Sequence, residues 1–257
     1  MLLAALILWL ATKTARPVQR QQQTSISTVS AGRMSRLPKL FLWAWERPED
    51  LRFIDPHRVG VAYLAQTLHL RGKEMGIRPR LQPLHVPPDT VLIAVTRIEA
   101  DRTFALSTDN GRVEAIASAI QKSIGSAAAV QLDFDARNSE RTFYLQIIDA
   151  LRRQMPDSVG LSITALASWC LFDRWLSDVP VDEIVPMMFR MGPEAFQIRT
   201  DIASGQDFQE PDCCGSVGIA TDEPFPTRTA VRRRVYAFNP RPWSRRDFEN
   251  LLLGVNR

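Results

Sequence analysis

The chain has 257 residues, of which 45% are hydrophobic and 23% charged, with 12 glycines and 17 prolines. This composition excludes a disordered or collagen-like chain and is typical of a domain with a packed core. A mean hydropathy of −0.13, with one strongly apolar segment, excludes a protein with several membrane spans. The net charge is +4, and its arginine clusters, Arg232–Arg234 and Arg245–Arg246, are short. Clusters of this size are typical of solvated surfaces, so we expect no nucleic-acid partner.

The apolar segment lies at the amino terminus. Leu2–Ala11 is too short for a comfortable membrane span and has the length of the apolar part of a signal peptide, although its basic neighbours, Lys13 and Arg16, follow the run. We expect residues 1–15 to be an export signal or short membrane anchor, with a wrongly chosen start codon as the alternative. Residues 16–36 lack apolar periodicity and predict a linker. The folded domain is then 37–257, in a periplasmic or secreted protein.

Eight segments of that domain are predicted to be β-strands. Several are nearly continuous apolar runs, which is typical of parallel strands buried on both faces of a sheet. Pro186 weakens the prediction of the sixth strand, because proline has no N–H to donate to a neighbouring strand. The expected strands are Lys39–Glu46, Arg58–Leu64, Thr90–Glu99, Ala128–Asp135, Gly160–Ser168, Glu183–Met191, Gly215–Glu223 and Arg234–Asn239.

Helical patterns separate some of these strands. One helix is expected to begin at Ser107 or Thr108 and another at Asn138 or Ser139, each followed by apolar residues at spacings of three and four. Residues 64–88 are a poor helix, rich in proline and arginine. Alternating strands and helices predict an α/β fold, a (β/α)₈ TIM-type barrel in which some helices are shortened. A doubly wound sheet is the alternative, but no glycine-rich dinucleotide loop follows any strand.

The fourth strand carries two aspartates on one face. Side chains alternate along a strand, so Leu132 and Phe134 share one face while Asp133 and Asp135 share the other. The outer face of a barrel packs against helices, which places both aspartates inside, near the carboxyl end of the strand. Buried carboxylates so close together are costly unless paired or protonated, and such sites are often functional. The alternative is an ion pair with an inward-pointing arginine.

Further polar and aromatic residues follow the ends of other strands. Barrel active sites lie at the carboxyl ends of the strands, and carboxylates among tryptophans suit a sugar, because aromatic faces stack on pyranose rings. We expect Asp135 and Glu223 to be the catalytic carboxyl groups and Asp133 to tune them. The expected substrate-binding residues are Trp43, Trp45, Arg97, Glu99, Arg137, Trp169, Arg190 and Trp243, with Glu46 on the same rim.

Other chemistries have little support. His57, His69 and His85 do not have the spacing of metal ligands, and phosphate-loop and serine-nucleophile motifs are absent from the sequence. We therefore expect no metal and no cofactor. In an oxidising compartment Cys170 could pair with Cys213 or Cys214; the alternative is three reduced thiols.

Several motifs resemble a bacterial family known as domain of unknown function 3142. They are LWAWERPEDLRF, VQLDFDARNSE, LSITALASWC, VPMMFRMG and TDEP, and the resemblance runs from about Leu37 to Trp243. It implies a barrel related to glycoside hydrolases. A more distant likeness is to family 18 chitinases, whose fourth strand carries D-x-D-x-E. Asp133 and Asp135 match the two aspartates, whereas Arg137 stands where those enzymes have the catalytic glutamate.

Three functions remain open from the sequence. The first is a carbohydrate-active enzyme, similar to glycoside hydrolases, in which one carboxyl group protonates the leaving oxygen and the other attacks the sugar or activates water. The second is a barrel that binds a glycan without cleaving it, because the expected acid is replaced by Arg137. The third is a membrane-tethered envelope protein that acts through partners and whose carboxylates are structural.

Overall fold

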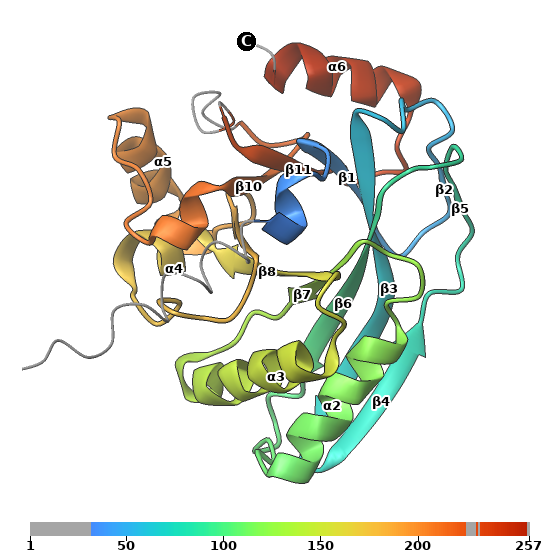
Figure 1. The fold of residues 1–257 in the computed structure, drawn as a ribbon. Helices are drawn as coiled ribbons and strands as arrows, with labels where there is room; N and C mark the ends of the chain where they lie inside the picture. Colours follow the sequence, from blue (N-terminus) through green and yellow to red (C-terminus); the bar gives the residue numbers. More distant parts are fainter. Residues whose placement is uncertain (1–31, 225–229, 231, 256–257) are drawn as a thin grey trace, which may run out of the picture.

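The computed structural model describes residues 32–224, 230 and 232–255. Eight parallel strands form a closed barrel, because β1 pairs with both β11 and β3. The expected TIM-type barrel is therefore confirmed (Figure 1). In spatial order the barrel strands are β1 (Leu40–Ala44), β11 (Arg234–Phe238), β10 (Ser216–Ala220), β9 (Glu183–Met187), β8 (Gly160–Leu166), β7 (Ala129–Asp133), β6 (Leu92–Ala100) and β3 (Val59–Arg71).

Helices follow five of these strands within the described part of the chain. Figure 1 shows α2 and α3 side by side next to β6 and β7, while α4 and α5 lie beside β8 to β10. The cap of α2 is Asp109, whose side chain accepts a 3.0 Å hydrogen bond from the backbone N–H of Arg112, rather than the expected Ser107 or Thr108. The helices are α2 (Asn110–Lys122), α3 (Arg141–Gln154, after a 3₁₀ turn at Asn138–Glu140), α4 (Ala167–Phe172), α5 (Ala195–Ala203) and α6 (Arg245–Val255).

No helix follows β3. Instead β3 continues far beyond the barrel wall and turns back as the antiparallel strand β4 (Glu74–Pro79), so residues 64–88 form a hairpin and loop. A register shift between Leu64 and Gln66 marks where β3 leaves the wall. A small parallel pair, β2 (Glu49–Asp50) and β5 (Leu84–His85), fastens the loop after β1 to the segment after this hairpin.

The barrel interior is packed with aromatic rings and one buried polar cluster. Phe41 stacks on Tyr236 with ring centroids 5.2 Å apart. Glycine on neighbouring strands makes room for such rings, since a Cβ at Gly218 would lie 2.8 Å from the Trp43 ring. Below these rings Glu183 accepts from Tyr236 at 2.5 Å and pairs with Arg234, both side chains being buried. The interior is thus a core closed at its amino-terminal end.

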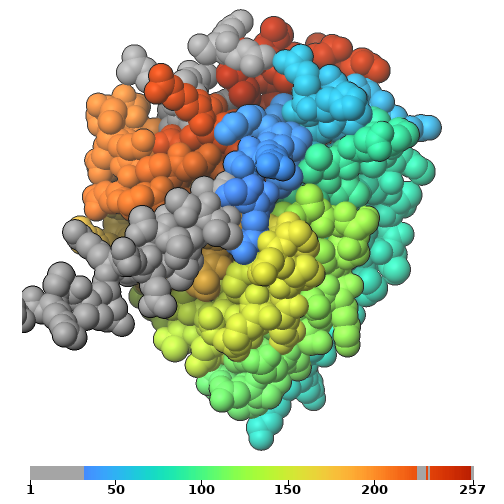
Figure 2. All heavy atoms as spheres, viewed as in Figure 1, coloured from blue at the N-terminus to red at the C-terminus, as the bar shows by residue number. Residues whose placement is uncertain are grey.

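The domain begins earlier than the sequence predicts. Met34 is 3% exposed and plugs the floor of the barrel, where a Cβ at Gly160 would lie 2.5 Å from its sulfur. Arg234 donates to the carbonyl oxygen of Met34, and Arg33 pairs with Asp182 at 2.9 Å. In Figure 2 the first described residues are blue and lie near the middle of the face of the molecule that is drawn. The expected linker boundary at residue 36 is therefore wrong at its carboxyl end; residues 1–31, with the expected signal or anchor, lie outside the described residues.

Candidate active site at the carboxyl ends of the barrel strands

Asp133 is the last residue of β7 and faces the interior of the barrel. Its carboxylate accepts a 2.8 Å hydrogen bond from the hydroxyl of Thr164 on the neighbouring strand β8. Leu132 and Phe134 are buried on the opposite face, and the Phe134 ring meets Tyr144 of α3 edge to face. The predicted alternation is therefore confirmed for these three residues.

Asp135 lies two residues further on, past the end of the strand. It is exposed, so the expected strand is two residues too long. Burial and the nearby carboxylate of Asp135 raise the pKa of Asp133 to about 6, although the Thr164 hydrogen bond and the charge of Arg97 lower it. The two aspartates thus form one electrostatic unit, in which Asp133 keeps a proton at a pH where most carboxyl groups have lost theirs.

Neither aspartate is neutralised by an ion pair within the described residues. Arg97 is the register partner of Asp133 on β6, but its guanidinium bonds Glu99 at 2.9 Å and lies 5.8 Å from the centroid of the Trp45 ring. Glu99 is also 3.1 Å from Nδ1 of His69. Trp45, Arg97 and Glu99 therefore lie in one sector of the rim, next to Asp133, as the sequence predicts.

Glu223 lies in a different sector of the rim, and its carboxylate is bonded by two arginines. Arg199 of α5 bonds one of its oxygens at 2.7 Å, and Arg190 bonds the other. Arg190 also bonds Asp222 at 2.7 Å. A carboxylate held by two guanidinium groups has little capacity to act on a substrate. Glu223, predicted to be catalytic, and Arg190, predicted to bind substrate, instead tie the loop after β9 to the loop after β10.

Three of the four expected tryptophan platforms are part of the core. Trp43, Trp169 and Trp243 are each 5% exposed or less, so they offer no ring face to a sugar. Trp43 donates a 2.8 Å hydrogen bond to Gln131 inside the barrel, and Trp169 packs edge to face on Trp175. Only Trp45 of the four is partly exposed.

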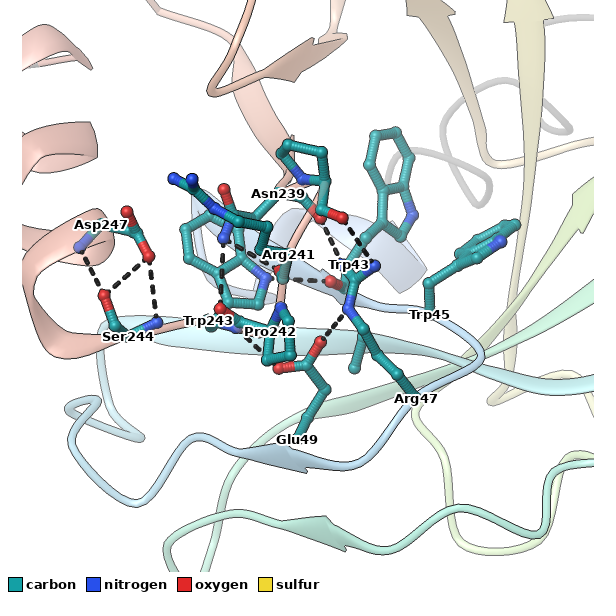
Figure 3. A network of polar contacts seen from close by, with 12 residues as sticks. Trp43, Trp45, Arg47, Glu49, Asn239, Arg241, Pro242, Trp243, Ser244 and Asp247 are labelled. Atoms are coloured by element: carbon teal, nitrogen blue, oxygen red, sulfur yellow. Dashed lines mark hydrogen bonds and ion pairs between the residues drawn. The ribbon is translucent and has the colours of Figure 1, made fainter.

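Trp243 fastens the loop after β11 to β1, as Figure 3 shows. Its ring N–H donates to the carbonyl of Trp43 at 3.0 Å, and its backbone N–H donates to Glu49 at 2.8 Å. Glu49 is buried and paired with Arg47 at 2.9 Å, and Arg47 in turn reaches the carbonyl of Pro240. These bonds fix the start of the loop that carries Trp45.

Arg137 is exposed, and its side chain has no ion-pair partner among the residues that the structure describes. Its backbone N–H donates to Glu140 at 2.8 Å, which starts the turn into α3. The position two residues after Asp135 therefore presents an exposed cation at the rim.

Sequence reasoning missed Thr164, His69, Arg199 and Tyr144. Tyr144 is fully buried, its hydroxyl has no hydrogen-bond partner in the described structure, and burial together with Asp133 and Asp135 raises its pKa well above its ordinary value. Thr164 could have been found, since strand alternation places it on the inward face beside Asp133. Arg199 and Tyr144 sit on helices, where the sequence shows only ordinary surface and core positions.

Two of the three cysteines are joined in a disulfide. Cys170 of α4 and Cys213 form a disulfide with their Cα atoms 5.9 Å apart, and Cys214 is free. No cluster of three or more metal-ligating side chains occurs among the described residues. In the same part of the chain no helix is long and apolar enough to cross a membrane.

The fold and this rim define an α/β barrel with an acidic pair at the carboxyl ends of its strands. No protein-family model and no curated protein sequence matches the chain, so membership of domain of unknown function 3142 stays a prediction. Among solved structures the chain is similar to an apo endo-beta-N-acetylglucosaminidase from Cordyceps militaris, with 6% identity and a TM-score of 0.47. The similarity covers 93% of this chain and 98% of that one.

Proposed function

We propose that the protein is a carbohydrate-active enzyme that hydrolyses a glycan at Asp133 and Asp135. The observation that carries the proposal is the unpaired aspartate dyad at the carboxyl ends of the barrel strands, with the pKa of Asp133 raised to about 6. A carboxyl group with a pKa near the working pH is suited to general acid catalysis. Glycoside hydrolysis needs such an acid beside a second carboxylate.

In this mechanism Asp133 donates its proton to the oxygen of the leaving sugar as the glycosidic bond breaks. The exposed carboxylate of Asp135 stabilises the positive charge that develops on the ring, and it attacks the sugar or activates water. Water supplies the hydroxyl group of the product and returns a proton to the dyad. Thr164 holds the Asp133 carboxyl group in place through its 2.8 Å hydrogen bond.

Neighbouring side chains supply the sugar contacts. The partly exposed ring of Trp45 is the platform on which a pyranose face would stack, and Arg97 and Glu99 offer donors and acceptors to hydroxyl groups. Their side chains are 38% and 39% exposed, which leaves them accessible to a ligand. The exposed guanidinium of Arg137 adds a further donor at the rim.

One observation favours a second function, the binding of a glycan without cleavage. Arg137 stands where the D-x-D-x-E pattern has its glutamate, so the chain lacks the acid of that pattern. The two functions are separated by whether the wild type releases new reducing ends or only retains the glycan. The third function, a membrane-tethered envelope protein whose carboxylates are structural, would be favoured by arginines that neutralise the two aspartates, and in the described structure neither aspartate is in an ion pair with an arginine.

The test is turnover of a glycan panel by the wild type and three matched Asp→Asn variants. Asp133→Asn and Asp135→Asn should each lower the rate by about 10²–10⁴-fold, because neither amide can ionise. Asp50→Asn is the control, since Asp50 is an exposed carboxylate paired with Arg52 outside the barrel; it should retain full activity. Binding by the wild type without turnover supports the second function. No binding and no turnover across the panel contradicts both.

The disulfide supports the proposed periplasmic or secreted location. Disulfides persist in oxidising compartments and are rare in the cytosol, and Cys170 and Cys213 are joined in the structure. Thiol labelling of the protein in fractionated cells tests this location. One labelled cysteine per chain, in a fraction outside the cytosol, is the expected result, because only Cys214 is free.

A further inference from the structure

A small pocket with a mixed polar and apolar lining opens beside the proposed active site, at the foot of the β3–β4 hairpin. Its volume is about 190 Å³, below the roughly 300–1,000 Å³ typical of sites for drug-sized ligands. It therefore suits a single ring rather than a whole oligosaccharide. Its lining includes the polar residues Glu46, Thr67, Arg78 and Arg80 and the apolar residues Leu64, Pro79 and Leu81.

The sheet register connects this pocket to the aspartate dyad. Arg78 of β4 is the partner of Thr67 of β3, Thr67 is the partner of Arg97 of β6, and Arg97 is the partner of Asp133. These four residues form one row across neighbouring strands. Because strands are spaced about 4.7–4.9 Å apart, Thr67 lies roughly 10 Å from Asp133 along the row. A short run of linked sugar rings spans that distance.

The side chains of the pocket are held in place before any ligand arrives. The Thr67 hydroxyl donates to Glu46 at 3.4 Å, and Arg78 pairs with the same carboxylate. Among the described residues, the guanidinium of Arg80 donates to four backbone carbonyl oxygens around the pocket, including those of Ala44 at 3.2 Å and Arg47 at 2.7 Å. It thereby fixes the loop that carries both Glu46, which lines the pocket, and Trp45, the proposed sugar platform.

The chemistry of the pocket fits a neutral polyhydroxyl ring. Glu46 and Arg78 form an ion pair, and their side chains remain 41% and 54% exposed, which leaves hydrogen-bonding capacity for hydroxyl groups. The guanidinium of Arg80, the other charged group of the lining, already donates to backbone carbonyl oxygens. Leu81, 86% exposed at the edge of the pocket, offers an apolar contact for the face of a ring. A sugar ring combines hydroxyl groups that Glu46, Thr67 and Arg78 can bond with an apolar face that Pro79 and Leu81 can contact.

We infer that the hairpin pocket is a second sugar-binding subsite, so that the protein prefers glycan chains long enough to reach from Asp133 to the β3–β4 hairpin. This inference rests on the proposed function, because it assigns the pocket to the same bound glycan. Asp133 and Asp135 act on the bond, and Glu46, Thr67 and Arg78 hold a sugar further along the chain.

The experiment compares kcat/KM for graded oligosaccharides, from disaccharide to hexasaccharide, of the chitin, cellulose and xylan series. Arg78→Ala removes a side chain of the pocket, and the matched control Ile77→Ala alters the next residue of β4, which is 50% exposed and points to the other face. For the wild type we expect kcat/KM to rise with chain length and then level off. Arg78→Ala should lose about tenfold on the long members and nothing on the short ones, while Ile77→Ala should follow the wild type.

Each outcome decides one of the two claims. An equal loss on short and long members, or a wild-type rate independent of chain length, overturns the subsite while the proposed function stands. Failure of the wild type to bind or cleave any member of the three series overturns the proposed function, and the subsite with it. Leu81→Ala provides a second test if Arg78→Ala unfolds, because Leu81 is almost fully exposed and should show the same dependence on chain length.

Discussion

The hydroxyl of Thr164 lies 2.8 Å from Oδ1 of Asp133, across the pair of strands β8 and β7. Thr164 thus donates directly to the carboxyl group of Asp133, whose pKa is raised by burial and by the nearby carboxylate of Asp135. Thr164 therefore has two effects on Asp133. It orients the carboxyl group, and it limits how far the pKa rises, because a hydrogen bond to the anion favours the ionised form.

The raised pKa of Asp133 predicts a particular dependence of stability on pH. The folded protein holds this proton up to about pH 6, whereas the unfolded chain releases it near 3.8. The contribution of Asp133 to the free energy of unfolding therefore falls as the pH rises from 3.8 to about 6, by at most about 3 kcal/mol in total. Asp133→Asn removes the ionisation, so it should raise the unfolding free energy at about pH 8 and have little effect near pH 4.

Chemical denaturation of both proteins at the two pH values measures this difference. An Asp133→Asn variant that is less stable than the wild type at about pH 8 would show that Asp133 is a structural anion, stabilised by its surroundings. Asp50→Asn, at an exposed position, serves as the control for the loss of one carboxylate.

The barrel floor predicts a strong effect at Met34. Replacing this 3% exposed side chain by alanine should lower the unfolding free energy by about 2–5 kcal/mol, because it leaves a cavity between the strand ends. Arg36→Ala, two residues away and exposed, should change it by less than about 0.5 kcal/mol. Urea denaturation compares the two variants. Equal stabilities would mean that residues 32–36 are a linker after all.

The disulfide predicts unequal effects for adjacent cysteines. Cys213→Ser removes the disulfide to Cys170, which joins residues 43 positions apart, and should lower the unfolding free energy by about 2–4 kcal/mol. Cys214→Ser should leave it near the wild-type value, since Cys214 is free. Guanidinium denaturation without reductant compares them. The reverse order would mean that Cys170 pairs with Cys214.

The barrel could be predicted from the sequence because its strands are short apolar runs with clear ends. β8 and β10 are buried throughout or nearly so, which is why their sequences read as continuous strands. Asp133 was predictable for a related reason: alternation alone separates it from Leu132 and Phe134. The hairpin after β3 was not, because Arg71–Pro79 carries charges, glycines and a proline that break both helical and strand patterns.

The sequence also did not reveal which side chains contact one another in the fold. Glu223 ends beside Arg199 because α5 packs over the loop after β10, and the spacing of the two residues along the chain does not indicate this contact. Trp43 and Trp243 look like rim residues by position, yet the closed barrel and the loop after β11 bury them. Met34 is one apolar residue in a polar segment, which carries no periodic signal.

The central claim is that Asp133 is the proton donor, and the pH dependence of kcat/KM tests it most directly. The measurement uses the wild type and Thr164→Val, with the glycan that the wild type cleaves. For the wild type kcat/KM should fall as the pH rises through about 6, where Asp133 loses its proton. Thr164→Val removes the hydrogen bond that favours the ionised form, so it should move this fall to higher pH. A wild-type kcat/KM that rises through pH 6, or a fall at the same pH in both proteins, would contradict the assignment of Asp133 as the acid.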